Sequence, residues 1–77
     1  MPTAKILDWT DARVQLKTDE YEDVRYQVYR CDNAYFLDIQ DSANEPLHTL
    51  ELPEGMKLDK SSYEVLLRYV LLDVVAA

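Results

Sequence analysis

Two apolar runs joined by a two-residue turn constrain this chain most. Residues 24–31 and 34–40 are rich in β-branched and aromatic side chains, and only Asp32 and Asn33 separate them. Aspartate and asparagine tolerate the positive φ that tight hairpin turns require. The pattern therefore predicts an antiparallel β-hairpin with a two-residue loop.

The loop length also decides which side chains share a face of this hairpin, because side chains alternate along a strand. Counting back from the turn pairs Val28 with Leu37, and Tyr29 with Phe36. The first pair lies on the predicted core face. That face consists of Val24, Tyr26, Val28, Tyr35, Leu37 and Ile39. The opposite face carries Tyr29, Cys31 and Phe36, and a loop one residue longer would exchange the two faces.

The region before this hairpin also alternates apolar and polar residues. Residues 5–9 and 13–17 are predicted as two short strands separated by a turn. The intervening Thr10-Asp11-Ala12 is also typical of a helix N-terminus, so a short helix running to Lys17 is an open alternative.

An acidic run connects this region to the hairpin. Residues 18–23 contain four carboxylates, namely Asp19, Glu20, Glu22 and Asp23. This density of charge is incompatible with burial, so the run is predicted to be a solvated loop tip. It is also a candidate surface for a basic partner.

The chain after the hairpin is predicted to form one more strand and one helix. Residues 41–46 have the composition of a turn, and residues 47–52 indicate a strand that ends at a proline. Two capping signals compete for the start of the helix: Asp59 as the N-cap, or Ser61 with Glu64 as a capping box.

The predicted helix is apolar on two sides. The stripe assigned to the core consists of Tyr63, Leu66, Leu67, Val70, Leu71 and Val74. A second stripe, formed by Val65, Tyr69 and Leu72, stands at positions i, i+4 and i+7 on the far side. The whole pattern predicts a single α+β domain over residues 1–77. Its architecture is an antiparallel β-meander of four to five strands packed against one C-terminal α-helix.

The second apolar stripe has two interpretations, because one sheet cannot cover both sides of a helix. Isolated apolar side chains are common on protein surfaces, so the stripe can simply stay in solvent. Alternatively, it packs against the same helix of a twofold-related subunit, or against a different partner. We favour self-association as a homodimer.

Length and cysteine content favour the same interpretation. A domain of 77 residues buries a modest share of its surface and benefits from extra stabilisation. Cys31 is the only cysteine and His48 the only histidine, which excludes an intrachain disulfide and the usual Cys/His metal spacing. Of the usual ways to stabilise a small domain, oligomerisation is therefore the one that remains. A lone cysteine also suits the reducing cytoplasm.

The charge balance limits the partners. Fifteen acidic and eight basic side chains give a net charge of −7, which repels nucleic-acid phosphates and anionic membranes but attracts a basic protein. The N-terminus lacks the apolar core of a signal peptide. The apolar stretch at residues 65–77 is shorter than the ~20 residues that span a bilayer. We expect a cytoplasmic protein that binds neither nucleic acid directly nor a membrane.

The sequence contains few candidates for a catalytic, phosphate-binding or metal-binding site. Cys31 and His48 are the only pair typical of nucleophilic catalysis, and they fall in different predicted strands. Gly55 is the only glycine, which excludes a glycine-rich phosphate loop. The oxygen ligands Asp38, Asp41, Asn44 and Glu45 do not have the spacing of a calcium loop. No catalytic residue, metal or cofactor is predicted.

These observations predict a small acidic protein-interaction module. The candidate partner-binding residues are Asp19, Glu20, Glu22, Asp23, Tyr29, Phe36, Val65, Tyr69 and Leu72. One form of the hypothesis is an inhibitor that presents carboxylates in place of phosphates to a basic nucleic-acid-binding protein. The alternative is a small enzyme or ligand-binding domain with a pocket at a subunit interface.

Overall fold

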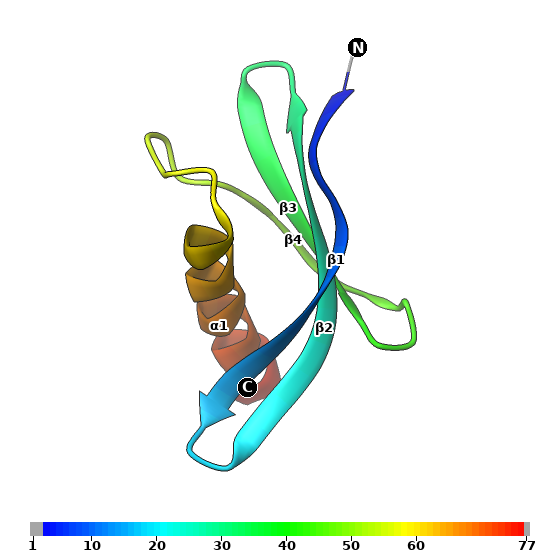
Figure 1. Ribbon diagram of the computed structural model, residues 1–77, viewed down its shortest axis with the longest axis vertical. Coiled ribbons are helices and arrows are strands. Elements are labelled where there is room, and N and C mark those ends of the chain that lie inside the picture. The colour runs from blue at the N-terminus through cyan, green and yellow to red at the C-terminus, as the bar shows by residue number, and fades with distance from the viewer. Residues whose placement is uncertain (1–2, 77) are drawn as a thin grey trace.

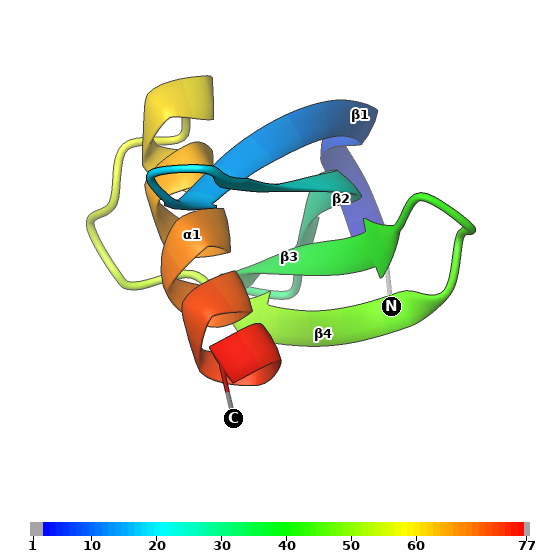
Figure 2. The same cartoon turned by 90° about the horizontal axis from the view of Figure 1, so that it is seen from below.

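Four antiparallel strands and one helix form the fold (Figures 1 and 2). The computed structural model describes the backbone of residues 3–76 and the side chains of residues 3–73. The elements are β1 (Thr3–Lys17), β2 (Glu20–Cys31), β3 (Ala34–Asp41), β4 (Pro46–Glu51) and α1 (Lys60–Ala76). The strand order is β1-β2-β3-β4, and α1 covers one face of the sheet, which we call the inner face. The predicted α+β meander with a C-terminal helix is confirmed, with four strands.

The β2–β3 hairpin has the predicted register. Val28 pairs with Leu37, and Tyr29 pairs with Phe36. Asp32 takes the left-handed conformation with a φ of 58°, as a tight two-residue loop requires. The local turn therefore sets which side chains face the core.

The N-terminal region differs from the prediction. Residues 3–17 form one continuous strand, and neither a turn nor a short helix interrupts it. Thr10 and Ala12 pair with Tyr26 and Val24 of β2. The long β2 offers backbone partners along this whole length, which outweighs the turn preference of the Thr-Asp sequence. Shifts in register absorb the extra residues as bulges, the first two of them between Lys5 and Thr10.

The acidic run is also placed differently. Only Thr18 and Asp19 form the connection, while Glu20, Glu22 and Asp23 belong to β2. The prediction of a loop tip over residues 18–23 is therefore wrong. Charge is tolerated there because the C-terminal end of β1 and the N-terminal end of β2 extend beyond the rest of the sheet as a two-stranded ribbon (Figure 1).

The core lies between the inner face and α1. Its buried side chains are Val14, Leu16, Val24, Tyr26, Val28, Leu37, Ile39, Leu52, Tyr63, Leu67 and Leu71. The predicted core face of the hairpin is confirmed, except that Tyr35 is half-buried. Leu66 and Val70 of the helix are half-buried as well, and the side chain of Val74 lies outside the described residues. The aromatic rings of Tyr26 and Tyr63 pack edge to face, with centroids 6.1 Å apart.

Asp59 caps the helix. Its Oδ1 accepts a hydrogen bond from the backbone amide of Ser62 at 2.9 Å, and its carbonyl oxygen accepts one from the amide of Tyr63 at 3.1 Å. Of the two competing start signals, the aspartate N-cap is therefore the one that forms, and Ser61 lies inside the first turn.

Replacing Asp59 with alanine removes the acceptor for the Ser62 amide. We expect this variant to lower the melting temperature by a few degrees, whereas Ser61→Ala leaves it nearly unchanged. Thermal unfolding followed by circular dichroism measures both variants. Equal losses for the two would contradict the assignment of the cap.

The same cap gives stability a pH dependence. The hydrogen bond from the Ser62 amide holds the pKa of Asp59 below 3.8, its ordinary value. A carboxylate with a lowered folded pKa stabilises above its unfolded pKa and stops doing so as the pH falls through the folded value. The difference in melting temperature between wild type and Asp59→Ala should therefore be constant near neutral pH and shrink below pH 3.8. A difference that grows in acid would contradict this.

Candidate functional site

The candidate partner-binding residues lie on three separate surfaces. The first is the helix back face, which we define as Val65, Arg68, Tyr69 and Leu72. The second is the outer face of the sheet, opposite α1, with Tyr29 and Phe36. The third is the ribbon at the ends of β1 and β2, where the acidic run lies. The fold does not bring the three together into one site.

The helix back face is largely uncovered. Val65 is 56% exposed and Tyr69 is 70% exposed, while Leu72 is half-buried against the core. Together with Arg68 they line a shallow hollow of about 210 Å³. Arg68 Nε donates a hydrogen bond to the carbonyl oxygen of Gln15 at 3.1 Å. The guanidinium is therefore tied to β1, and the two exposed apolar side chains stand beside it.

On the outer face, the Tyr29 and Phe36 rings stack with centroids 5.6 Å apart, and both are half-buried. The Tyr29 hydroxyl donates a hydrogen bond to Asp38 Oδ1 at 3.3 Å. Burial, with the adjacent Asp38 carboxylate, raises the pKa of Tyr29 above its ordinary value. Because its polar end is bound within the chain, Tyr29 stabilises the hairpin in addition to offering an aromatic surface.

Asp38 is the centre of a network that links three strands. Besides the Tyr29 hydroxyl, it accepts hydrogen bonds from Gln27 Nε2 and Thr49 Oγ1, each at 2.8 Å. Sequence reasoning considered Asp38 as a metal ligand and missed this role. The sequence did contain one signal of this network. The predicted register places Gln27 opposite Asp38, and side chains directly opposed on neighbouring strands interact.

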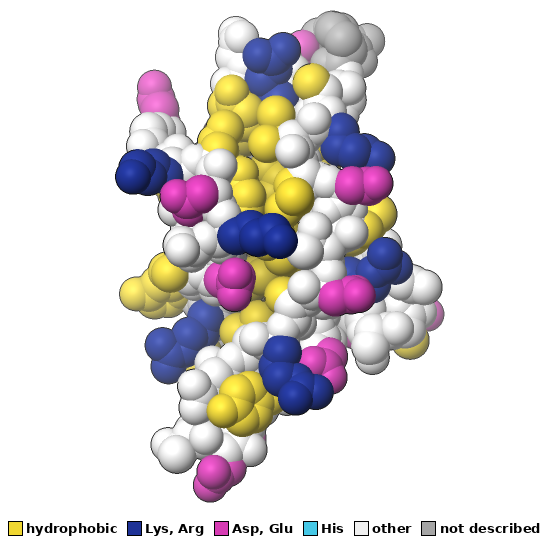
Figure 3. Space-filling model, in the orientation of Figure 1, with side chains coloured by type: hydrophobic (Ala, Val, Ile, Leu, Met, Phe, Trp, Pro, Cys, Tyr) yellow, Lys and Arg dark blue, Asp and Glu magenta, His cyan; other side chains and the backbone are white. Residues whose placement is uncertain are grey.

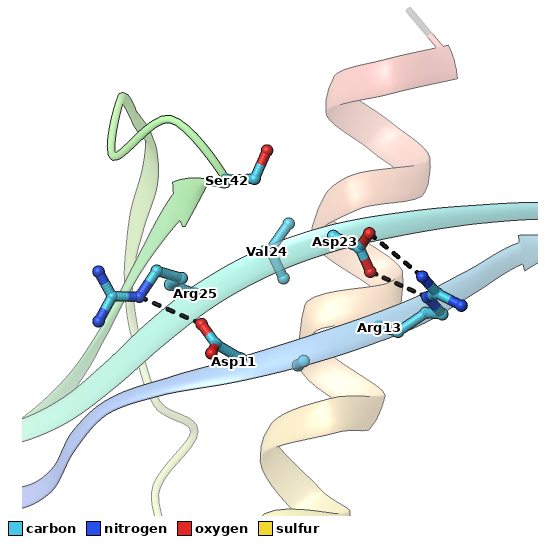
Figure 4. Close-up of a pocket in the computed structure, with 7 residues that line it drawn as sticks. Asp11, Arg13, Asp23, Val24, Arg25 and Ser42 are labelled. Carbon is cyan, nitrogen blue, oxygen red and sulfur yellow. Dashed lines mark hydrogen bonds and ion pairs between the residues drawn. The ribbon is translucent and has the colours of Figure 1, made fainter.

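The acidic run is partly neutralised by the chain itself. Asp23 accepts hydrogen bonds from Arg13 Nε at 2.9 Å and Nη2 at 3.4 Å, and these bonds lower the pKa of Asp23. A second ion pair joins Arg25 Nε to Asp11 at 3.2 Å. Figure 4 shows both ion pairs. Together with Val24, their residues line a hollow of about 400 Å³. The charges of this hollow cancel, so Asp23 attracts a basic partner less than the sequence suggests.

Cys31 and His48 are not brought together. Cys31 pairs with Ala34 at the tip of the hairpin, while His48 pairs with Ile39, about five strand positions away. Ile39 faces the core, so His48 is on the inner side and Cys31 on the outer side. Within residues 3–76, no group of three or more His, Cys, Asp or Glu is arranged to hold a metal ion. The described helix is too short or too polar to cross a membrane.

Comparisons with protein-family models, with curated proteins and with solved structures give no match. Function is therefore inferred from the surfaces that this chain presents.

The Asp38 network provides a test of the sheet. Asp38→Ala leaves three donors without their acceptor and should lower the free energy of unfolding by roughly 1–3 kcal/mol, measured by urea denaturation. The control is Asp73→Ala, because Asp73 is exposed on the helix. Removing Asp38 should also return the pKa of Tyr29 toward its ordinary value in an absorbance titration compared with Tyr29→Phe. Equal stability of the two alanine variants would contradict the network.

Proposed function

We propose that this chain is a self-associating protein-interaction module whose helix back face packs against the same face of a second copy. The observation that carries this proposal is the contrast across α1. Leu67 and Leu71 are fully buried on one side, while Val65 and Tyr69 are more than half exposed on the other. An amphipathic helix on a sheet normally presents polar side chains to solvent.

The spacing of the apolar residues suits contact with another helix. Val65, Tyr69 and Leu72 follow the i, i+4, i+7 pattern of a helix seam and span about 10 Å along the axis. In a twofold contact, the ring of Tyr69 from one copy can fill the shallow hollow of the other. Complete burial is worth about 1.5–3 kcal/mol for each such side chain before the costs of association. With so few side chains, the expected dimer is weak.

Charge on the flank of this face is self-complementary. Glu64 and Arg68 lie on the same side of the stripe, one turn apart. A twofold antiparallel contact places the same flanks of both helices side by side. Because the Nε of Arg68 is bound to the carbonyl oxygen of Gln15, the terminal nitrogens of its guanidinium are the atoms that can approach Glu64 of the other copy. This favours a second copy of the chain over an unrelated apolar partner.

The dimer is tested by measuring the mass in solution by light scattering over a series of protein concentrations. Wild type should approach twice 9.0 kDa at high concentration and fall toward 9.0 kDa on dilution. Tyr69→Glu should be a monomer throughout, because the interface would bury an unpaired carboxylate. Tyr21→Glu is the matched control, since Tyr21 is 56% exposed on β2 and lies outside the helix back face.

A wild-type mass of 9.0 kDa at every concentration would contradict self-association. The same holds for a Tyr69→Glu variant that keeps the wild-type mass. Circular dichroism of both glutamate variants verifies that each is folded. A Tyr21→Glu variant that also becomes a monomer would show that the association depends on overall charge.

Association with a basic protein is the second part of this proposal. Asp19 and Glu20 are exposed, and no ion pair joins them to another described residue. The net charge of −7 adds a long-range attraction. Exposed charges of this kind accelerate the encounter more than they strengthen the complex. An inhibitor of a basic nucleic-acid-binding protein is one form of this function. The enzymatic alternative loses its candidate catalytic pair, because Cys31 and His48 lie on opposite faces of the sheet.

A further inference from the structure

A cleft that the sequence did not suggest opens between the tip of the β2–β3 hairpin and the loop after β4. Its volume is about 470 Å³, within the range of sites that bind small molecules or side chains. Tyr35 lines it from β3, while Leu52, Met56 and Leu58 line it from the end of β4 and the loop. Figure 3 shows hydrophobic side chains gathered between this loop and the neighbouring ends of the strands.

Backbone hydrogen bonds hold the walls of the cleft in place. The amide of Leu52 donates to the carbonyl oxygen of Tyr35 at 2.8 Å, which ties the start of the loop to β3. The amide of Met56 donates to the carbonyl oxygen of Pro53 at 3.2 Å, and Gly55 between them has a φ of 81°. This positive φ favours glycine over other residues. The loop is therefore a tight turn whose apolar side chains stay near the hairpin.

The walls present apolar surface to solvent. Leu58 is 42% exposed, and Tyr35 and Met56 are half-buried, while Leu52 is only 6% exposed. A methionine adapts its shape readily to a partner, and a tyrosine combines an apolar ring with a polar end. These side chains suit an occupant that is itself largely apolar along its length.

The charged side chains in the lining of the cleft have one sign. They are Glu51 and Glu54, and both are exposed. Glu51 pairs with Phe36, so its side chain lies at the rim of the cleft on the outer side of β4. Neither carboxylate makes a hydrogen bond or ion pair with another described side chain. Lys57 belongs to the same loop but is not part of the lining. The hollow between β1 and β2 differs, because each of its carboxylates faces an arginine.

We propose that this cleft binds a basic, partly apolar segment of a partner protein. The alkyl stem of a lysine or arginine lies against Tyr35, Met56 and Leu58. Its cationic end reaches Glu54 in the loop, and a second basic side chain of the segment reaches Glu51 at the rim. Lysine and arginine bury their stems on apolar surface while the charged head stays in water or meets a carboxylate. The site is separate from the helix back face, so it does not depend on self-association.

The test measures fluorescence anisotropy of a short dye-labelled peptide of lysine and leucine with the full chain. The same peptide with glutamate in place of lysine is the negative probe. The double variant Glu51→Gln/Glu54→Gln should weaken binding roughly tenfold, because two charged contacts are lost. Leu58→Ser should weaken it several-fold by removing apolar contact.

Glu45→Gln/Asp73→Asn is the matched control, because it changes the net charge by the same amount at two exposed carboxylates that do not line the cleft. We expect it to weaken binding by less than about twofold. Equal weakening by both double variants would overturn the proposal, since attraction would then follow net charge alone. Failure of the lysine peptide to bind wild type, or an unaltered affinity in Leu58→Ser, would overturn it as well.

Two further measurements separate this proposal from the helix-mediated dimer. Tyr69→Glu should bind the peptide as wild type does, and Glu51→Gln/Glu54→Gln should keep the wild-type mass by light scattering. Loss of peptide binding in Tyr69→Glu would place the peptide on the helix back face and overturn the assignment to the cleft. Circular dichroism of each variant verifies folding, which is expected because all the substituted side chains are exposed.

Discussion

The packing of α1 against the inner face of the sheet, where β1 is its nearest strand, is the contact on which the rest of this structure depends. Leu67 and Leu71 meet a face whose Val28 and Leu37 are fully buried, and the described core contains no buried charged residue. One polar group is buried with this packing: no described residue forms a hydrogen bond with the Tyr63 hydroxyl, and a hydroxyl left unbonded in a core costs about 1–3 kcal/mol. Burial of the ring beside Tyr26 offsets this cost.

The same packing explains which surfaces are left for partners. A single helix covers only part of a twisted sheet, and it exposes the side that points away. The strand edges are poor candidates for pairing with another chain. Shifts in register interrupt β1, and β4 is short and begins with Pro46, which are common ways of blunting an edge. Association is therefore expected through side chains, on the helix back face and in the cleft beside the hairpin tip.

Charge is distributed unevenly over this acidic chain. On the outer face, Arg13 and Arg25 each hold a carboxylate, and Arg25 also lies over the ring of Trp9 at 5.9 Å. These two ion pairs neutralise the four charges that they join. The carboxylates without an ion pair among the described residues include Asp19 and Glu20 at the ribbon, and Glu51 and Glu54 at the cleft. Net charge alone does not locate a binding site, because most of its effect acts at long range.

The sequence by itself determined a hairpin register that follows from a two-residue turn, a helix that begins at one of two neighbouring caps, and the two apolar sides of that helix, because each depends on residues close together in the chain. Asp32, the Asp59 cap and the spacing of Val65 and Tyr69 are local signals. The tertiary structure alone decided the continuity of β1, the position of Glu20 to Asp23 within β2, the Asp38 network and the cleft. Each of these requires contact between segments far apart in sequence, whose pairing outweighs local preference.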